Sequence, residues 1–112
     1  MIKVVNKRTH KPSPDAIDEY IGRGSGLGNP FTHIKRRMTL AKYVVESPEK
    51  ALAMYEGWLP LQLANPKSAA SIQFRHIVKL AEKYDVNLVC FCAPNRCHGD
   101  FVKKLIDNLI NK

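Results

Sequence analysis

Two stretches of the chain have the composition of short strands. Residues 2–6 contain three β-branched apolar side chains ahead of a charged stretch, which predicts a strand. Residues 86–92 are nearly continuous in apolar side chains, a pattern typical of a strand that is buried on both faces. We therefore expect 86–92 to lie inside a sheet.

Three segments instead have apolar residues at helical spacing. Ser47 followed by Pro48 and an acid is a helix start signal, with Ser as the N-cap and Pro at the first position. Tyr55 and Trp58 lie on the apolar face of this first helix, and we interpret both as core residues. A second helix is expected over 67–84, and an amphipathic third helix follows Cys97-His98-Gly99-Asp100.

The segment 7–42 shows no helical period and is punctuated by glycine and proline. We expect a long irregular segment, interrupted by a brief strand around Glu19–Ile21. The order strand, loop, helix, helix, strand, helix predicts an α/β class. The expected architecture is a small single-domain Rossmann-like fold over 1–112, with a short, mostly parallel sheet flanked by helices in two or three layers.

Charge and composition narrow the function classes. The 112 residues carry a formal net charge of +8, and the segment 1–42 supplies six of these charges. Such a balance favours an anionic partner, such as a nucleotide, a phosphorylated metabolite or nucleic acid. The densest basic run, Lys35-Arg36-Arg37, is more typical of a solvated face than of a binding stripe. No apolar run reaches the ~20 residues of a membrane helix, so we expect no membrane partner and a cytoplasmic location.

The first candidate site is Gly22-Arg23-Gly24-Ser25-Gly26-Leu27-Gly28-Asn29-Pro30-Phe31. Alternate glycines let backbone N–H groups approach and cradle an anion, and Arg23 adds a fork-shaped donor for phosphate or carboxylate. The spacing matches neither a P-loop nor a dinucleotide fingerprint. A flexible surface loop is the alternative interpretation. The residues that we expect to bind a ligand are Arg8, Gly22, Arg23, Gly24, Ser25, Gly28, Asn29 and Cys92.

The second candidate site contains all the cysteines, Cys90, Cys92 and Cys97. An odd number in one cluster indicates a local site in a reducing compartment and not a disulfide framework. These thiols with His98 would make a zinc site, although C-x-C departs from the usual ligand spacing. Alternatively, Cys90 and Cys92 are small buried residues.

The start of the last helix offers a different chemistry. Its unpaired N–H groups lie beyond the carboxyl end of a buried strand, where ligands bind in open α/β sheets. A helix N-terminus also favours the thiolate form of cysteine. Cys97, His98 and Asp100 are therefore the candidate catalytic group, while an acid at Asp100 is equally expected merely to complement the helix dipole.

Both motifs resemble those of an uncharacterised family of short phage and bacterial proteins. That family is recognised by G-R-x-S-P-L-G-N-P-F and C-x-C-x-P-x-x-C-H-G-D. Gly26 stands where the family often has Pro, and Phe91 where it often has Trp. The resemblance spans almost the whole chain, and it implies the expected fold and a single site built from both motifs. It implies no particular reaction.

We therefore expect a nucleotide, or a phosphate compound derived from one, to be bound and sequestered or sensed in a cleft between the glycine-rich segment and the last helix start. Two alternatives stay open. One is a small hydrolase or transferase that acts on a nucleotide or phosphoribosyl compound through Cys97, His98 and Asp100. The other is a zinc-stabilised module that binds nucleic acid. A homodimer with its cleft across the two-fold interface is also compatible with so small a domain.

Overall fold

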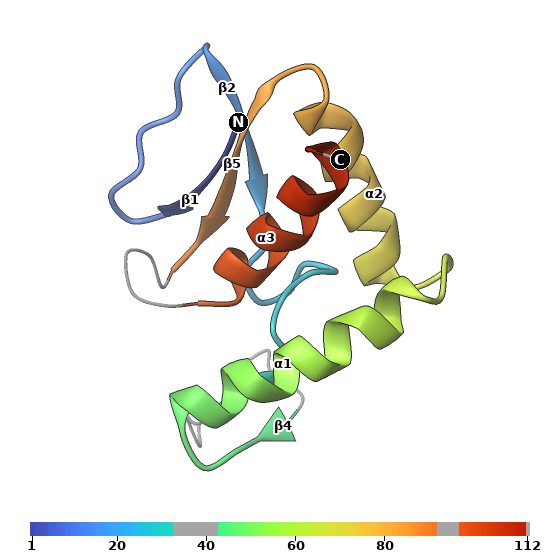
Figure 1. Ribbon diagram of the computed structural model, residues 1–112. Coiled ribbons are helices and arrows are strands. Elements are labelled where there is room, and N and C mark those ends of the chain that lie inside the picture. The colour runs from blue at the N-terminus through green and yellow to red at the C-terminus, as the bar shows by residue number, and fades with distance from the viewer. Residues whose placement is uncertain (33–42, 92–96, 112) are drawn as a thin grey trace.

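Three short strands form a parallel sheet at the centre of the structure, in the order β1-β5-β2 (Figure 1). The computed structural model describes residues 1–32, 43–91 and 97–111. In chain order the elements are β1 (Ile2–Asn6), β2 (Ala16–Tyr20), β3 (Phe31–Thr32), β4 (Tyr43–Val44), α1 (Pro48–Leu63), α2 (Ala69–Ala81), β5 (Asp85–Cys90) and α3 (His98–Ile110). The expected strands at 2–6 and within 86–92 are both confirmed. The basic run 35–37, Cys92 and the expected turn that follows Cys92 lie outside the described residues.

β2 is longer than the sequence pattern indicates, and it forms one edge of the sheet beside β5. The brief strand expected around Glu19–Ile21 is a five-residue strand that pairs with β5 along its whole length. Acidic residues interrupt its apolar pattern, which hid the strand. In the structure Asn87 Nδ2 donates a hydrogen bond to Asp18 Oδ1 at 3.0 Å. The two-residue strands β3 and β4 also pair in parallel, so the expected irregular segment contains more ordered pairing than its pattern indicates.

The helix starts follow the local capping signals. Ser47 Oγ accepts a hydrogen bond from Lys50 N at 3.1 Å, and Pro48 opens α1 as expected. Ser68 Oγ caps α2 in the same way, accepting from Ser71 N at 3.0 Å. Because Ser68 and Glu82 cap its ends, α2 is shorter than the expected 67–84. α3 begins directly after Cys97, where the sequence analysis expected it.

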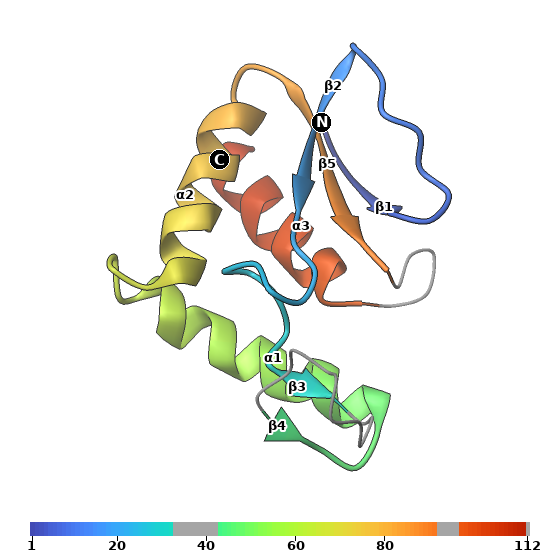
Figure 2. The same ribbon diagram turned by 180° about the vertical axis from the view of Figure 1, so that it is seen from behind.

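The helices α2 and α3 lie on the same face of the sheet, so the fold is a two-layer α/β domain (Figures 1 and 2). In Figure 2 the opposite face of the sheet carries no helix of the described chain. α1 crosses below the ends of β2 and β5 and contacts α2, α3 and β3. The α/β class and the short parallel sheet are thus confirmed. No helix among the described residues combines the length and apolar character needed to cross a membrane.

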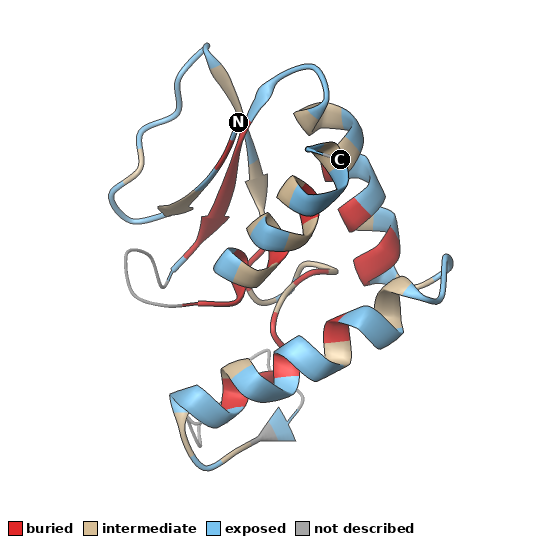
Figure 3. Ribbon diagram, viewed as in Figure 1, coloured by how far each residue is buried: buried red, intermediate tan, exposed pale blue. Residues whose placement is uncertain are grey.

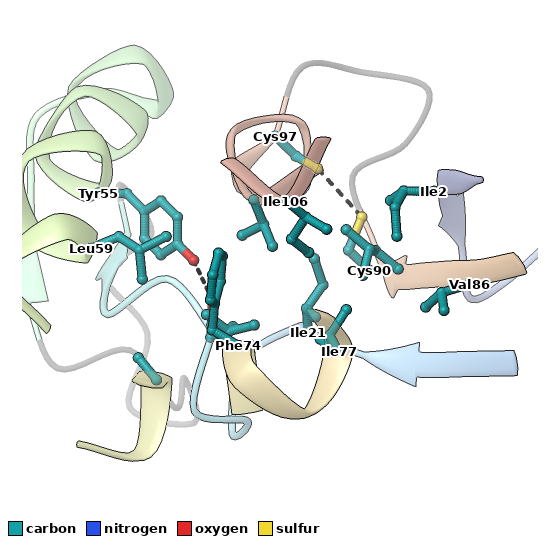
Figure 4. Close-up of a cluster of buried hydrophobic side chains, with 14 residues drawn as sticks. Ile2, Ile21, Tyr55, Leu59, Phe74, Ile77, Val86, Cys90, Cys97 and Ile106 are labelled. Carbon is teal, nitrogen blue, oxygen red and sulfur yellow. Dashed lines mark hydrogen bonds between the residues drawn. The ribbon is translucent and has the colours of Figure 1, made fainter. Parts of the chain in front are cut away.

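The core lies between the sheet and its helices (Figure 3). β5 is buried from Val86 to Cys90, as its apolar run predicts. Figure 4 shows side chains from β1, β5 and all three helices meeting in one cluster. Its members are Ile2, Ile21, Leu27, Tyr55, Leu59, Ala70, Phe74, Ile77, Val86, Leu88, Cys90, Cys97, Val102 and Ile106. Leu27 and Cys97 belong to the two candidate motifs, so both motifs are anchored in the same core.

Candidate functional site

The glycine-rich segment, Gly22–Pro30, follows β2 and is here called the glycine loop. Of its four glycines only Gly24 has a positive φ, at 95°. At two other positions there is no room for a side chain. A Cβ at Gly26 would overlap the backbone oxygen of Ala69, and one at Gly28 would lie within 2.5 Å of the Gly22 carbonyl oxygen. Packing of the loop against α2 and against itself therefore requires glycine at positions 26 and 28, and the expected anion cradle stays a prediction.

Arg23 and Asn29 hold the shape of the glycine loop. The Arg23 guanidinium donates to the carbonyl of Phe31 at 3.1 Å and makes a long contact of 3.5 Å with that of Asn29. The buried Asn29 side chain accepts from Phe31 N at 2.9 Å and donates to Ala51 O at 3.3 Å. Both side chains thus satisfy backbone groups of the protein, and their expected roles in ligand binding stay predictions.

A pocket of about 570 Å³ lies between the glycine loop, the second half of α1 and the start of α2. We call it the loop pocket. Its lining residues are Arg23, Gly24, Ser25, Gly26, Gly28, Asn29, Pro30, Trp58, Gln62, Asn65, Ser68, Ala69 and Ala70. The first N–H groups of a helix have no partners within the helix and carry its positive dipole end. The first turn of α2 contains no acid, so nothing in that turn offsets this positive end.

α1 contributes a wall of the loop pocket that the sequence pattern does not reveal. Trp58 is expected in the core, and its ring is indeed partly buried against the core, with its centroid 5.6 Å from that of the Tyr55 ring. The same ring also lines the pocket, together with Gln62 and Asn65. Trp58 and Gln62 have the spacing i, i+4 of one face of α1, and Asn65 follows just beyond the end of the helix. That spacing is visible in the sequence, but only the fold shows that the face meets the glycine loop.

The start of α3 is organised by Cys97. Its Sγ accepts a hydrogen bond from Gly99 N at 3.3 Å, while Asp100 Oδ2 accepts from Cys97 N at 3.1 Å. This is a capping box with cysteine in place of the usual Ser or Thr. Asp100 is exposed in the first turn of α3, a position where an acid complements the helix dipole, and its expected catalytic role stays a prediction.

The thiols of Cys90 and Cys97 are in contact, with their Sγ atoms 3.4 Å apart (Figure 4). Both cysteines are buried and no disulfide joins them, so the burial expected of Cys90 is confirmed. Within the described residues no group of three His, Cys, Asp or Glu side chains could hold a metal ion. Since the zinc alternative also needs Cys92, which lies outside those residues, it stays a hypothesis.

His98 joins the second motif to the glycine loop. Its Nε2 lies 2.6 Å from the Ile21 carbonyl oxygen, and because a carbonyl only accepts, Nε2 carries the proton. Burial lowers the pKa of His98 below its ordinary value, which favours the neutral ring. The Tyr55 ring packs edge-on against His98 with centroids 5.2 Å apart. The Tyr55 hydroxyl donates to Leu27 O at 2.6 Å, and burial raises the pKa of Tyr55.

Cys97, His98 and Asp100 all line a second pocket, of about 260 Å³, which we call the helix pocket. Its remaining lining residues are Leu52, Tyr55, Glu56, Phe101 and Lys104. Neither the helix pocket nor the loop pocket is lined by both motifs. The described residues of the two motifs thus line two separate pockets along α1. The single cleft expected between the motifs stays a prediction.

Two expected binding residues belong to neither of these pockets. Arg8 lies just beyond β1, with its guanidinium carbon 5.7 Å from the centre of the Phe91 ring. Gly22 is buried at the base of the glycine loop, where a Cβ would overlap the Tyr20 ring. Both assignments stay predictions, and Gly22 also has a packing reason to be glycine.

These features define a small α/β domain whose sequence motifs follow β2 and β5 and line two adjoining pockets. The chain belongs to the family described as a domain of unknown function (DUF4326), whose model matches residues 4–108. The match covers both motifs, as their resemblance to an uncharacterised family implies. No curated protein and no solved structure matches the chain.

Proposed function

We propose that the protein binds a nucleotide, or a phosphate compound derived from one, in the loop pocket. The observation that carries this proposal is the composition of that pocket: the glycine loop and the α2 start form one wall, and the Trp58 ring and two amides form another. Its volume of about 570 Å³ lies within the ~300–1,000 Å³ typical of small-molecule sites. The net charge of +8 would also draw an anionic ligand toward the protein.

The phosphate end of the ligand would lie between the glycine loop and the first turn of α2. Ser68 caps this helix, and the N–H groups of Ala69 and Ala70 precede the first intrahelical hydrogen bonds. Ala69 and Ala70 both line the loop pocket, as do Gly24 and Gly26. Backbone N–H groups from a loop and a helix start are the combination by which proteins bind phosphate without a specific basic residue. In this sense the glycine loop is a phosphate-binding loop.

The base end of the ligand would lie against α1. Trp58 offers an aromatic face for stacking, and the amide groups of Gln62 and Asn65 offer donors and acceptors for the edge of a base. Asn65 Oδ1 already accepts from Lys67 N at 3.0 Å, which leaves its amide N–H groups to face the ligand. The protein would thus distinguish nucleotides from plain phosphate.

Binding without turnover explains the site better than catalysis does. The helix pocket supports the alternative of a hydrolase or transferase, because Cys97, His98 and Asp100 line it together. However, His98 Nε2 donates to Ile21 O and Asp100 accepts from Cys97 N. These bonds occupy Nε2 of His98 and one carboxylate oxygen of Asp100. The Cys97 sulfur accepts from Gly99 N. Each member of the candidate catalytic group therefore already has a partner within the protein.

The proposal includes a cytoplasmic location and a role in sequestering or sensing the ligand. Nucleotides are abundant in that compartment, and its reducing conditions keep thiols free. The alternative of a zinc-stabilised nucleic-acid module would instead require Cys92 to complete a metal site.

Isothermal titration with AMP, ADP, ATP and inorganic phosphate tests the proposal, with Gln62→Glu and Leu61→Glu as a matched pair of variants. Gln62 lines the loop pocket, whereas its neighbour Leu61 is 72% exposed. A new negative charge in the pocket that holds an anionic ligand, with loss of the Gln62 amide N–H groups, is expected to weaken binding about tenfold, the equivalent of about 1.4 kcal/mol. The same charge at position 61 should leave affinity nearly unchanged.

Two outcomes would contradict the proposal. One is the absence of heat from every nucleotide at ligand concentrations up to about 1 mM, where even weak complexes form. The other is equal weakening by Gln62→Glu and Leu61→Glu, because binding would then depend on overall charge and not on the loop pocket. Turnover of a nucleotide that is abolished by Cys97→Ser would favour the enzyme alternative.

A further inference from the structure

The carboxyl ends of the three central strands carry a cluster of cations and aromatic rings outside both pockets. We call Lys7, Arg8, Tyr20 and Phe91 the edge cluster. Lys7 Nζ lies 4.9 Å from the centre of the Tyr20 ring and 5.8 Å from that of Phe91. The Arg8 guanidinium carbon lies 5.7 Å from the centre of the Phe91 ring. The two rings contact each other edge-on, with centroids 6.2 Å apart.

The backbone holds this cluster in place. Lys7 N donates to Cys90 O at 2.7 Å, and Asn6 Nδ2 donates to Phe91 O at 3.2 Å. The first bond extends the pairing of β1 with β5 by one residue beyond β1, and the second ties the residue after β5 to the Asn6 side chain. Phe91 is nevertheless 47% exposed, so a large ring is presented to solvent on a fixed backbone. A fixed ring loses little conformational entropy when a partner stacks on it.

The edge cluster carries two positive charges, those of Lys7 and Arg8. Among the described residues neither side chain forms a salt bridge. Asp18 lies two residues before Tyr20, on the same face of β2. Its carboxylate already has two partners, because Asp18 Oδ1 lies 3.0 Å from both Asn87 Nδ2 and His10 Nε2. The cluster therefore combines two cations with an exposed ring, and its complement is a partner with phosphates and flat rings.

We propose that the edge cluster binds single-stranded nucleic acid, with an unpaired base stacked on Phe91 and adjacent phosphates held by Lys7 and Arg8. A ring and neighbouring cations are the two components by which proteins bind single strands without reading their sequence. A base in a duplex has both faces covered, so a duplex would engage only the cations. The basic segment at residues 7–8 contains no aromatic side chain, and the fold supplies the rings from residues 20 and 91.

This site is independent of the proposed nucleotide site. Neither Lys7, Arg8 nor Phe91 lines the loop pocket, and neither Trp58 nor Gln62 belongs to the edge cluster. Failure of one proposal therefore leaves the other intact. Variants at the two places make the distinction measurable, because each site should respond only to its own variants.

Fluorescence anisotropy with a labelled oligo(dT) of about ten nucleotides, a length within the site sizes of single-strand binders, tests the proposal. The ring variants are Phe91→Ala and Phe91→Leu, with Tyr84→Ala as the control, since Tyr84 is also exposed but lies at the opposite end of β5. Loss of stacking is expected to weaken binding about 5- to 100-fold in both Phe91 variants. Tyr84→Ala and Gln62→Glu should bind as the wild type does.

The cations are tested by the salt dependence of the same binding. For single strands the slope of log affinity against log salt is about −0.7 per phosphate contact. The double variant Lys7→Ala/Arg8→Ala should therefore make the slope shallower by about 1.4. Lys79→Ala/Lys83→Ala removes the same charge from exposed positions before β5 and should leave the slope unchanged.

Several results would overturn the inference. A duplex of the same length that binds as tightly as the single strand would exclude stacking. Equal effects of the Phe91 and Tyr84 variants would show that the ring has no special role, and equal effects of the two lysine-containing double variants would show only general attraction to a basic protein. Binding of an acidic peptide at the affinity of the oligonucleotide would indicate a protein partner instead.

Discussion

The pH dependence of folding stability provides a direct test of the interior contact between the two motifs. His98 is 6% exposed, and its Nε2–H donates to Ile21 O. Burial is the largest cause that lowers its pKa, with Arg23 adding to it, while the Ile21 carbonyl, Cys90 and Asp100 act in the opposite direction. The net direction is downward. Folding therefore requires the neutral imidazole over a pH range in which a solvated histidine is already protonated.

The sign of the effect follows from proton uptake. The unfolded chain binds a proton at this histidine near pH 6.5, whereas the folded protein binds it only at lower pH. The stabilising contribution is therefore complete above the unfolded pKa and falls as the pH drops below it, with a limiting slope of about 1.4 kcal/mol per pH unit. Lowering the pH from about 7.5 to about 5.5 should cost up to about 1.4 kcal/mol from this residue.

Urea unfolding followed by circular dichroism across this pH range measures the slope. The informative variants are His98→Gln, which keeps an amide N–H donor but cannot titrate there, and His76→Gln. The His76 side chain is 60% exposed beside Glu19. His98→Gln is expected to lose the slope and His76→Gln to retain it. If the free energy of unfolding has the same pH dependence in His98→Gln as in the wild type, the inference that His98 is neutral in the folded protein is wrong.

Two further predictions concern packing around the glycine loop. Tyr55→Phe leaves the buried Leu27 carbonyl without its donor and should cost about 1–3 kcal/mol of stability, whereas Tyr84→Phe at an exposed position should cost almost nothing in the same urea titration. Gly26→Ala introduces a Cβ that overlaps backbone of α2 and should lower the free energy of unfolding by about 1–3 kcal/mol. Gly57→Ala meets no atom within 4 Å inside α1 and should instead raise stability by about 0.5–1 kcal/mol. Equal effects of these two alanines, or a stabilising Gly26→Ala, would contradict the packing account.

The two candidate motifs are coupled through His98 and through Tyr55 of α1, whose ring packs against His98. His98 donates to Ile21 O, immediately before the glycine loop, and Tyr55 donates to Leu27 O within it. Each contact joins residues that are far apart in the chain, 77 and 28 positions respectively. The second motif therefore has a structural reason to accompany the first, because it fixes the loop that lines the larger pocket.

Local signals in the sequence determined much of the framework. The apolar strands at β1 and β5, the Ser47 cap and the start of α3 at Cys97 all depend on neighbouring residues, so a pattern is sufficient to predict them. β2 was underestimated because the partner that satisfies Asp18 is Asn87, 69 positions away. No local period records such a partner.

Only the tertiary structure decided what the candidate residues do. Glycines that suggest an anion cradle are mostly required by close packing, and the Arg23 guanidinium holds backbone carbonyls. Trp58 reaches the loop pocket because α1 crosses the ends of the strands. Phe91 meets Lys7 because β1 and β5 are neighbours in the sheet. The helix or strand preference of a residue depends on its neighbours in the sequence, whereas the contacts that give its side chain a function depend on which distant segment the fold brings against it.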